Sequence, residues 1–393
     1  MRQYILSIIT AVAMVATIPA TATPPSGDWG TENSSFSIMT LNVDCLPGKL
    51  LVFTLNADGP KSAGSEAIST YMATKDCDII AMQEDFNYHW EIWSRLFASY
   101  EHDEWTGGVI IEEMQDQDFI HPHNIKLKCD GLNTAWKREC QSTAYERVAW
   151  GRSFGKFSHA FDDLITKGFR RHEFTLQNGT EVVVYNMHLD ASNRYDVPLD
   201  KDMKDRETRL SQLEQLRQHI MENLDNRPVV VVGDLNCLYY RDALKTTFID
   251  AIQTTGLATV GDVWVEKHLD GVYPELGSEP LADETFDKVL YINPTNADVV
   301  ITPTSAEVDK TGYTGLDGQP LGDHYPLIVR FNIVPTRGTT GISTVATTPT
   351  SGGWGAEWYT LQGISTSATT PPSGGRGAAR INISRSGQKI IKK

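Results

Sequence analysis

The pattern of apolar and polar residues along the chain predicts short buried strands separated by helices. The strands are expected at residues 36–43, 78–85, 181–190, 229–236, 286–292 and 325–331. Most of these runs are rich in β-branched residues, as strands covered on both faces are. Apolar residues at helical spacing predict helices over 65–75 and 210–224, the second with Asp205 as its N-cap. Strands alternating with helices indicate an α/β protein.

Polar residues with chemical potential stand at the ends of these strands. They are Asn42, Glu84, His188, Asp190, Asp234, Asn236, Asp287, Asp323 and His324. Each residue alone has an ordinary explanation, such as a turn former, a core histidine or a solvated strand end. Their regular recurrence at apolar strand ends instead predicts one shared site, because α/β proteins place their chemistry there. Carboxylate and amide oxygens suit a Mg²⁺-type ion, and the histidines supply acid, base and phosphate-binding groups.

The charge of the chain argues against a protein that holds nucleic acid on a broad basic surface. The net charge is −15 over 393 residues. The tail after residue 334 contains seven Lys or Arg and one Glu, so residues 1–334 have a net charge of −21. Nucleic-acid affinity comes mainly from basic side chains that neutralise phosphates. We therefore expect no stable nucleic-acid complex, although a bound metal ion could still recruit a phosphate.

The N-terminal residues predict secretion. Residues 1–22 begin with Met-Arg, continue through a short apolar run and end in Ala-Thr-Ala, which is typical of a cleaved signal peptide. Residues 23–35 form a connector, and no span is expected to cross a membrane after cleavage. Sequons at Asn33, Asn178 and Asn382 add weak support for an extracellular glycoprotein.

The C-terminal residues 335–393 form a low-complexity tail. Residues 341–355 recur at 363–377, identical at 12 of 15 positions with an offset of 22 residues. Thr, Ser, Gly and Pro cannot bury enough apolar surface to fold, so a disordered stalk open to O-glycosylation is expected. An aromatic binding repeat built on Trp354 and Trp358 is the alternative.

Five cysteines are present, and none lies in a zinc-binding pattern. In an oxidising compartment, Cys129 and Cys140 would close a short loop, and we predict a disulfide between them. The odd count leaves one thiol without a partner.

The order of the strand-end motifs resembles the endonuclease/exonuclease/phosphatase superfamily. The motifs are Thr40-Leu41-Asn42-Val43, Gln83-Glu84-Asp85, His188-Leu189-Asp190, Gly233-Asp234-Leu235-Asn236, Asp287-Lys288-Val289 and Gly322-Asp323-His324-Tyr325-Pro326. The resemblance implies a catalytic domain over residues 36–334. It also implies a four-layered α/β sandwich, with two packed mixed β-sheets flanked by helices.

The resemblance implies in-line attack of water on a phosphoester. Asp234 would orient or deprotonate the water, and Asn236 would hold a phosphate oxygen. His188 would hydrogen-bond the phosphate. His324 would do the same or act as acid or base, oriented by Asp287.

The resemblance also implies a metal cofactor. Glu84 would be the principal Mg²⁺ ligand, with Asn42 and Asp323 close to the ion, and Mn²⁺ or Ca²⁺ as a substitute or second ion. Lys167 and Asn133 would lie at the substrate phosphate, although Lys167 could equally be a solvated turn lysine. Asp190 receives no role.

Within the superfamily, the motifs look most like secreted sphingomyelinase-type phosphodiesterases. A monomeric enzyme acting on a phospholipid such as sphingomyelin at a membrane surface is therefore expected. The alternatives are a secreted deoxyribonuclease, an inositol polyphosphate phosphatase and a catalytically silent surface module. Trp90, Trp93, Phe97 and Trp105 could form a lipid-contacting surface or could lie in the core.

Overall fold

A computed structural model describes most of the region with the strand pattern. It describes residues 34–46, 49–50, 53–54, 56, 58–106, 111–113, 125–127, 129–155, 162, 165–192 and 203–336, with four short strands near the C-terminus. Residues 1–340 form one compact unit and residues 341–393 another. The expected signal peptide, nearly all of the connector and most of the tail lie outside the described residues, so those assignments stay predictions.

The first sheet has six strands and contains the chain's first predicted strands. Its order is β15 (Val299–Val308), β16 (Leu327–Pro335), β1 (Ser34–Asn42), β4 (Ile79–Gln83), β8 (Asn133–Lys137) and β5 (Tyr100–His102). β1 runs parallel to β4 and antiparallel to β16, so the sheet is mixed.

The second sheet also has six strands and is mixed. Its order is β13 (Ala258–Asp262), β14 (Asp287–Pro294), β12 (Val229–Asp234), β11 (Glu181–His188), β10 (Gly168–Thr175) and β9 (Gln141–Ala149). β12 runs parallel to β11 and antiparallel to β14. The remaining described strands are short pairs, namely β2 (Lys49–Leu50) with β3 (Phe53–Thr54), β6 (Ile111–Glu113) with β7 (Ile125–Leu127), β17 (Trp358–Tyr359) with β18 (Ser365–Thr366), and β19 (Ile381–Ile383) with β20 (Lys389–Ile391).

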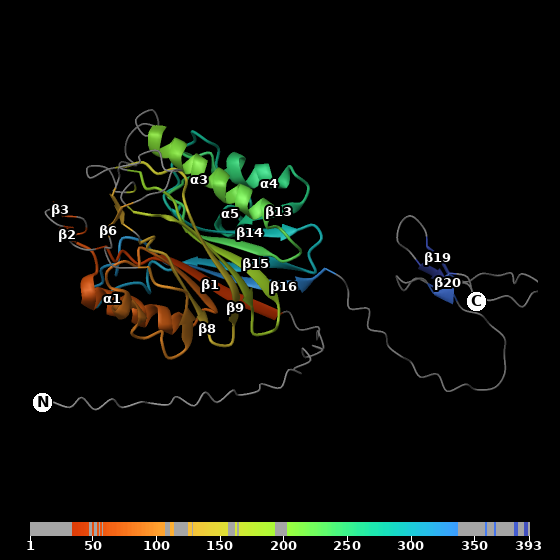
Figure 1. Cartoon of the computed structure of the whole chain (residues 1–393), viewed down its shortest axis with the longest axis horizontal. Coiled ribbons are helices and arrows are strands. Elements are labelled where there is room, and N and C mark those ends of the chain that lie inside the picture. The colour runs from red at the N-terminus through yellow and green to blue at the C-terminus, as the bar shows by residue number, and fades with distance from the viewer. Residues whose placement is uncertain are drawn as a thin grey trace, which may run out of the picture. The chain divides into compact units, whose positions relative to one another are not determined.

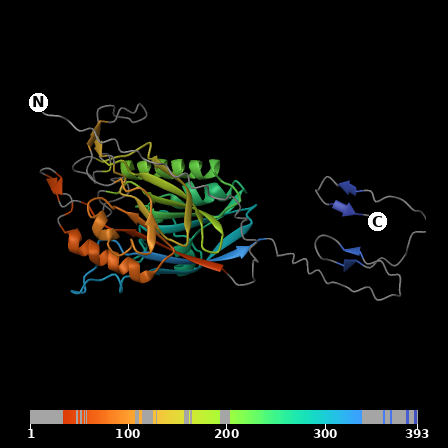
Figure 2. The ribbon, with the colours of Figure 1, turned by 60° about the horizontal axis from the view of Figure 1, so that its bottom comes forward.

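Helices cover the outer faces of the two sheets and complete four layers (Figures 1 and 2). The helices on the first sheet are α1 (Lys61–Lys75) and α2 (His89–Trp93). The helices on the second sheet are α3 (Met203–Glu222), α4 (Ala251–Gln253) and α5 (Val263–His268), and a π-helical turn at Lys245–Asp250 precedes α4. Separate apolar clusters fill the three spaces between the layers. The structure confirms the expected four-layered α/β sandwich. None of the described helices has the length and apolar character needed to cross a membrane.

The valines of β12 show why this strand lies in the middle of the sandwich. Val229 and Val231 pack in the cluster on the α3 side, whereas Val230 and Val232 pack between the two sheets. Successive side chains of a strand point to opposite faces, so an all-valine run suits a strand covered on both. Gly233 follows with φ 145°, and a Cβ there would collide with the Met187 carbonyl of β11.

Most predicted elements are present, and one detail of a predicted helix is wrong. The strands expected at 36–43, 78–85, 181–190, 229–236, 286–292 and 325–331 correspond to β1, β4, β11, β12, β14 and β16. Asp205 is not an N-cap, because it lies buried inside the first turn of α3. The pattern also missed β9, β10, β13 and β15, whose residues mix polar and apolar types.

The predicted Cys129–Cys140 disulfide is wrong. Both thiols are free and buried. β8 runs between the two cysteines, and its five residues alone extend the chain by about 16 Å at about 3.3 Å per residue. A disulfide needs Cα atoms within about 7 Å of each other. The sequence separation suggested a loop, but the intervening residues are an extended strand.

Candidate active site

The predicted site residues come together at one end of the sandwich. β1, β4, β11 and β12 finish there, at or just before Asn42, Glu84, His188 and Asp234. β14 and β16 run in the opposite direction and begin there, so Asp287 pairs directly with Asp234 and His324 lies just before β16. The mixed strand directions explain why residues far apart in sequence share one edge. A cavity of about 470 Å³ opens at this end.

Asp234 is the most connected carboxylate of the site. Its Oδ2 accepts a hydrogen bond from Asn42 Nδ2 at 3.2 Å, and its Oδ1 accepts from the Asn236 amide at 2.9 Å. The Nε2 atoms of His188 and His324 lie 3.4 and 3.7 Å from Oδ2. Burial would raise the pKa of Asp234, but the two histidines and the Asn236 amide hold it below its usual value. Asp234 is therefore an anion.

His324 is held in one orientation by Asp287. Its Nδ1 lies 2.6 Å from Asp287 Oδ2, which leaves Nε2 facing Asp234. Burial would lower the pKa of His324, but the carboxylates of Asp287 and Asp234 overcome this effect and raise it well above its usual value. His324 is therefore a cation at neutral pH, with a proton on Nε2.

His188 has the opposite electrostatic character. Burial and the neighbouring Lys167 ammonium lower its pKa well below its usual value. Lys167 Nζ lies 3.1 Å from His188 Nε2 and donates to the Leu189 carbonyl at 3.3 Å. Because Nε2 accepts from the ammonium, the proton of neutral His188 resides on Nδ1, which is buried without a partner among the described residues.

Lys167 is not the solvated turn lysine that the sequence left open. It is 6% exposed and forms an ion pair with Asp162, a carboxylate that the sequence reasoning missed. Burial would lower the pKa of Lys167, but Asp162 and Asp190 raise it, so the ammonium stays charged. Asp190, which had no expected role, is buried and accepts hydrogen bonds from Gln212 and the Phe154 amide.

A second group of carboxylates lies at the ends of β1 and β4. Burial, with Asp323 and Asp44 nearby, raises the pKa of Glu84 to about 8. Burial and Asp323 likewise raise the pKa of Asp44 to about 7. Asn42 hydrogen-bonds the Glu84 carboxylate as well as Asp234. The surrounding side chains do not fully compensate the charged forms of these carboxylates, and for this reason their pKa values are raised.

These carboxylates fit a Mg²⁺-type ion better than an ion that needs a full protein cage. Among the described residues, no three or more His, Cys, Asp or Glu side chains converge closely enough to enclose a metal. Mg²⁺ keeps several waters and binds through one or two carboxylates together with substrate phosphate oxygens. Glu84, with the Asn42 amide and exposed Asp323 beside it, supplies such a partial set of ligands.

The cavity wall contains several residues that the sequence reasoning did not select. Besides Glu84, His188, Asp234, Asn236, Asp287, Asp323 and His324, the lining includes Ala191, Ala282, Asp283, Glu284, Thr285, Phe286, Lys310 and Tyr325. Asp283 and Lys310 form an ion pair of 2.7 Å at the surface. Their signal in the sequence was weak, because both belong to loops without periodic pattern. Asp44 could have been found, since it directly follows the Asn42 strand.

Asn133 occupies a different place from the one expected. It is fully buried on β8 opposite Met82 of β4, and neither polar atom of its side chain has a partner among the described residues. Neither Asn133 nor Lys167 belongs to the cavity lining. A direct contact with the phosphate therefore stays a prediction for both.

The aromatic residues after Glu84 divide between core and surface. Trp93 is buried against α1, whereas Trp90 and Phe97 are 68% and 63% exposed. Trp105 is half-buried, and its ring stacks on His89 with centroids 4.5 Å apart. The core prediction therefore holds for Trp93, and a lipid-contacting surface that includes Trp90 and Phe97 stays a prediction.

Comparison with known proteins shows sequence similarity to sphingomyelinases. The chain is 25% identical over 322 residues to sphingomyelinases of Mycobacterium bovis and Mycobacterium tuberculosis. The aligned region covers 80% of this chain and 56% of the relatives, so the chain spans about half the length of the curated proteins it matches. No protein-family profile matches the chain.

Solved structures with a similar fold include TDP2, a beta toxin and an endonuclease/exonuclease/phosphatase. A humanized TDP2 of D. rerio has a TM-score of 0.49 at 16% identity, covering 76% of this chain and 99% of the other. Beta toxin of Staphylococcus aureus scores 0.45 at 14% identity, covering 75% and 99%. The endonuclease/exonuclease/phosphatase of Bacteroides vulgatus scores 0.46 at 13%, covering 76% and 99%. The sequence similarity confirms the expected resemblance of this chain to sphingomyelinases, and the fold is the four-layered sandwich that the motif resemblance implied.

Proposed function

We propose that this protein is a metal-dependent phosphodiesterase that hydrolyses a phospholipid such as sphingomyelin outside the cell. The observation that carries the proposal is the placement of anionic Asp234, hydrogen-bonded to Asn42, beside neutral His188 and cationic His324 in one cavity. Hydrolysis of a phosphodiester needs a positioned water, an acid for the leaving group and positive charge around the phosphate. Each need has a candidate residue in the cavity.

Asp234 and His324 divide the proton chemistry between them. Asp234 is an anion because its pKa lies below the usual value, so it accepts a hydrogen bond from the attacking water and aligns it with the phosphorus. It takes the proton of the water as the new P–O bond forms and later returns it to His324, which has given its own proton to the leaving oxygen. Because its pKa is raised, protonated His324 is a poor base and suits the role of acid, donating its Nε2 proton to the leaving oxygen. Asp287 holds the ring of His324 so that Nε2 faces this point.

The remaining cavity residues hold the phosphate. Asn236 lines the cavity. Its backbone has φ 46°, and its backbone N–H donates a hydrogen bond to Asp234 Oδ1. His188 faces the same cavity, and charged Lys167 lies behind it at 3.1 Å. Together they place the Asn236 amide and the positive charge of Lys167 near the transferred phosphate, with His188 Nε2 accepting a hydrogen bond from the Lys167 ammonium. Stabilisation of this kind is usually the largest contribution to such catalysis.

Glu84, Asn42 and Asp323 are the residues proposed to hold the cation, with Mg²⁺ as the preferred ion. A bound divalent cation would neutralise charge that develops on the phosphate oxygens. The raised pKa of Glu84 supports this assignment, because the carboxylate lacks a compensating charge of its own. Mn²⁺ could substitute for Mg²⁺ at a site made of oxygen ligands.

Two observations favour a lipid over a nucleic acid. The relatives with 25% identity are sphingomyelinases. Exposed apolar side chains also occur in segments that lead to the cavity wall, including Leu276 and Leu281 before Ala282 and Leu316 between β15 and β16. Apolar surface of this kind favours contact with a membrane interface. The net charge of −15 weakens the case for a deoxyribonuclease.

The test is a substrate panel with the purified chain and Mg²⁺. We expect release of choline phosphate from sphingomyelin vesicles, and no comparable nicking of plasmid DNA or release of inorganic phosphate from inositol polyphosphates. Activity should disappear with a chelator and return with Mg²⁺. Inactivity on every substrate would support the silent surface module, and plasmid nicking alone would support the nuclease.

Two substitutions and two matched controls test the site itself. Glu84→Gln and His324→Ala should each remove most activity, by about a hundredfold or more. Glu222→Gln on α3 and His268→Ala at the end of α5 change the same residue types outside the cavity and should keep full activity. Full activity in Glu84→Gln or His324→Ala would show that the site is assigned to the wrong residues.

A further inference from the structure

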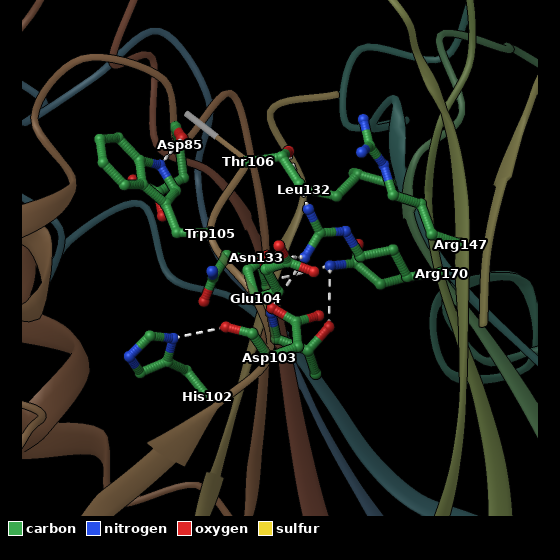
Figure 3. Close-up of polar contacts among 12 residues, drawn as sticks. Asp85, His102, Asp103, Glu104, Trp105, Thr106, Leu132, Asn133, Arg147 and Arg170 are labelled. Carbon is green, nitrogen blue, oxygen red and sulfur yellow. Dashed lines mark hydrogen bonds and ion pairs between the residues drawn. The ribbon is translucent and has the colours of Figure 1, made fainter. Parts of the chain in front are cut away.

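A buried ion cluster around Arg170 links the two sheets behind the candidate site. Arg170 lies on β10 of the second sheet, is fully buried and pairs in register with Asn186 of β11. Its Nη1 forms an ion pair with Asp103 at 2.9 Å and donates to the Glu104 carbonyl at 2.6 Å. Its Nε and Nη2 donate to the two carboxylate oxygens of Asp130 at 2.9 and 2.8 Å. Figure 3 shows the guanidinium among these groups.

The two segments that Arg170 binds adjoin strands β5 and β8 of the first sheet, and both of them form hydrogen bonds with Asp85. Gly131, next to Asp130, accepts a hydrogen bond from the Asp85 amide at 2.9 Å. Trp105, next to Glu104, donates from Nε1 to the Asp85 carbonyl at 2.9 Å, as drawn in Figure 3. The peptide groups on both sides of Asp85 are therefore fixed by segments that one guanidinium organises.

Asp85 directly follows Glu84, and Glu84 needs external support. Its backbone has φ 58°, in the left-handed region that residues with a Cβ adopt only at a cost. Such conformations persist when the surrounding structure holds them in place. The carboxylate of Glu84 also stands beside Asp44 and Asp323, which repel it. Without fixed neighbours, this turn would relax and move the carboxylate.

We propose that Arg170 is a positioning residue that fixes Glu84 of the first sheet relative to Asp234 of the second, and thereby sets the affinity for the divalent cation. The inference rests on the proposed metal role of Glu84. Arg170 is absent from the cavity lining, so it acts through Asp85 and not on the substrate. An arginine suits this role because its planar fork binds Asp130 through two atoms and still reaches Asp103 and the Glu104 carbonyl, whereas a lysine ammonium is a single point charge without this fixed fork.

The neighbouring residue offers a matched control. Arg171 follows on the same strand with its side chain on the opposite face, and it pairs with Glu173 at 2.6 Å. We expect Arg170→Lys to weaken Mg²⁺ binding at least tenfold, measured by calorimetry on the full chain. Arg171→Lys should stay within twofold of the wild type. At saturating Mg²⁺, kcat of Arg170→Lys should stay within about threefold of the wild type, because Arg170 does not contact the substrate.

Hydrogen exchange provides a readout that requires no metal. In Arg170→Lys, exchange of a peptide spanning residues 82–86 should become at least tenfold faster, because the Asp85 amide loses its fixed acceptor at Gly131. The Arg171→Lys variant should not show this change. If Mg²⁺ binding or this exchange stays within twofold of the wild type in Arg170→Lys, the inference is wrong.

If Arg170→Lys does not fold, a milder variant tests the same proposal. Thr106→Val removes one hydrogen-bond acceptor of Arg170 Nη2, at 3.1 Å, and keeps both carboxylates. We expect a threefold or greater loss of Mg²⁺ affinity, and unchanged affinity would overturn the inference.

If the wild-type chain bound no divalent cation, the proposed function itself would be wrong and the inference would fall with it. Cation binding that Arg170 does not influence would refute the inference alone.

Discussion

Two buried charge clusters lie at the same end of this sandwich, and they differ in how their charges are balanced. Around Arg170, burial would raise the pKa values of Asp103 and Asp130, but the guanidinium holds both below their usual value. Around the cavity, burial and repulsion between carboxylates raise the pKa of Glu84 to about 8 and of Asp44 to about 7. In the first cluster, the chain itself supplies the charges that compensate the carboxylates. In the second cluster, it does not.

The difference teaches which cluster maintains the structure and which serves chemistry. Ionised groups in low dielectric are tolerated when partners and hydrogen bonds compensate them. The Arg170 cluster meets this condition and joins segments of both sheets. Perturbed and uncompensated carboxylates in a cavity are instead typical of functional sites. A divalent cation and a substrate phosphate would complete the second cluster.

The largest expected effect comes from the anion at the centre of the cavity. Asp234→Asn should lower kcat about a thousandfold, because the attacking water loses its acceptor and His324 loses a neighbouring charge. The measurement is the initial rate on sphingomyelin vesicles, with Asp225→Asn on the surface as control. A loss of less than tenfold would contradict the central role of Asp234.

The next effect separates the two clusters by stability. Arg170→Met should lower the free energy of unfolding by about 3–5 kcal/mol, because it removes the buried guanidinium that Asp103 and Asp130 share and leaves them the weaker contacts of His172 and Arg147. Glu84→Gln should change the stability of the metal-free chain by less than about 1 kcal/mol, or raise it, since it removes an unbalanced charge. Urea unfolding of both variants measures this. Equal destabilisation by the two substitutions would remove the distinction between the clusters.

The pH dependence of stability should reveal the incomplete cluster. Glu84 and Asp44, with raised pKa values, retain protons in the folded chain that the unfolded chain has released. His324 does the same above pH 6.5, whereas His188, with its lowered pKa, opposes this effect only below pH 6.5. The metal-free chain should therefore lose stability as pH rises from 6.5 to about 8, by up to about 1.4 kcal/mol per pH unit for each such group.

Adding Mg²⁺ provides the control for this pH dependence, because the cation takes the place of the retained protons. Thermal unfolding from pH 6.5 to 8, with Mg²⁺ and with a chelator, measures the difference. Stability that rises over this interval in the metal-free chain would show that the carboxylates of the cavity are already compensated.

The smallest effect concerns the rim of the complete cluster. Arg147 lies 2.7 Å from Asp130 but is 30% exposed, so solvent screens the pair. Arg147→Lys should lower the free energy of unfolding by no more than about 1 kcal/mol and leave Mg²⁺ binding unchanged. Urea unfolding and calorimetry check both values. A loss as large as that of Arg170→Met would mean that the rim contributes as much as the buried centre.

The strands that carry the site were predictable because they are buried on both faces. The strands β1, β4, β11 and β12 are apolar runs. A strand covered on both faces has apolar residues throughout and does not alternate apolar with polar residues. β9 was missed because its residues are mostly exposed at the edge of the second sheet. The disulfide prediction failed for a related reason, since spacing in sequence did not reveal the extended β8 between Cys129 and Cys140.

The sequence by itself determined the buried strands, the polar residues at their ends and the resemblance that orders them. Local patterns suffice for this, because strand burial and strand ends depend on neighbouring residues. Only the tertiary structure decided the charge states of Asp234, His188 and His324, which depend on burial and on partners from distant strands. It also decided that Arg170 binds the two segments that form hydrogen bonds with Asp85. Contacts between the two sheets leave no periodic signal in the chain.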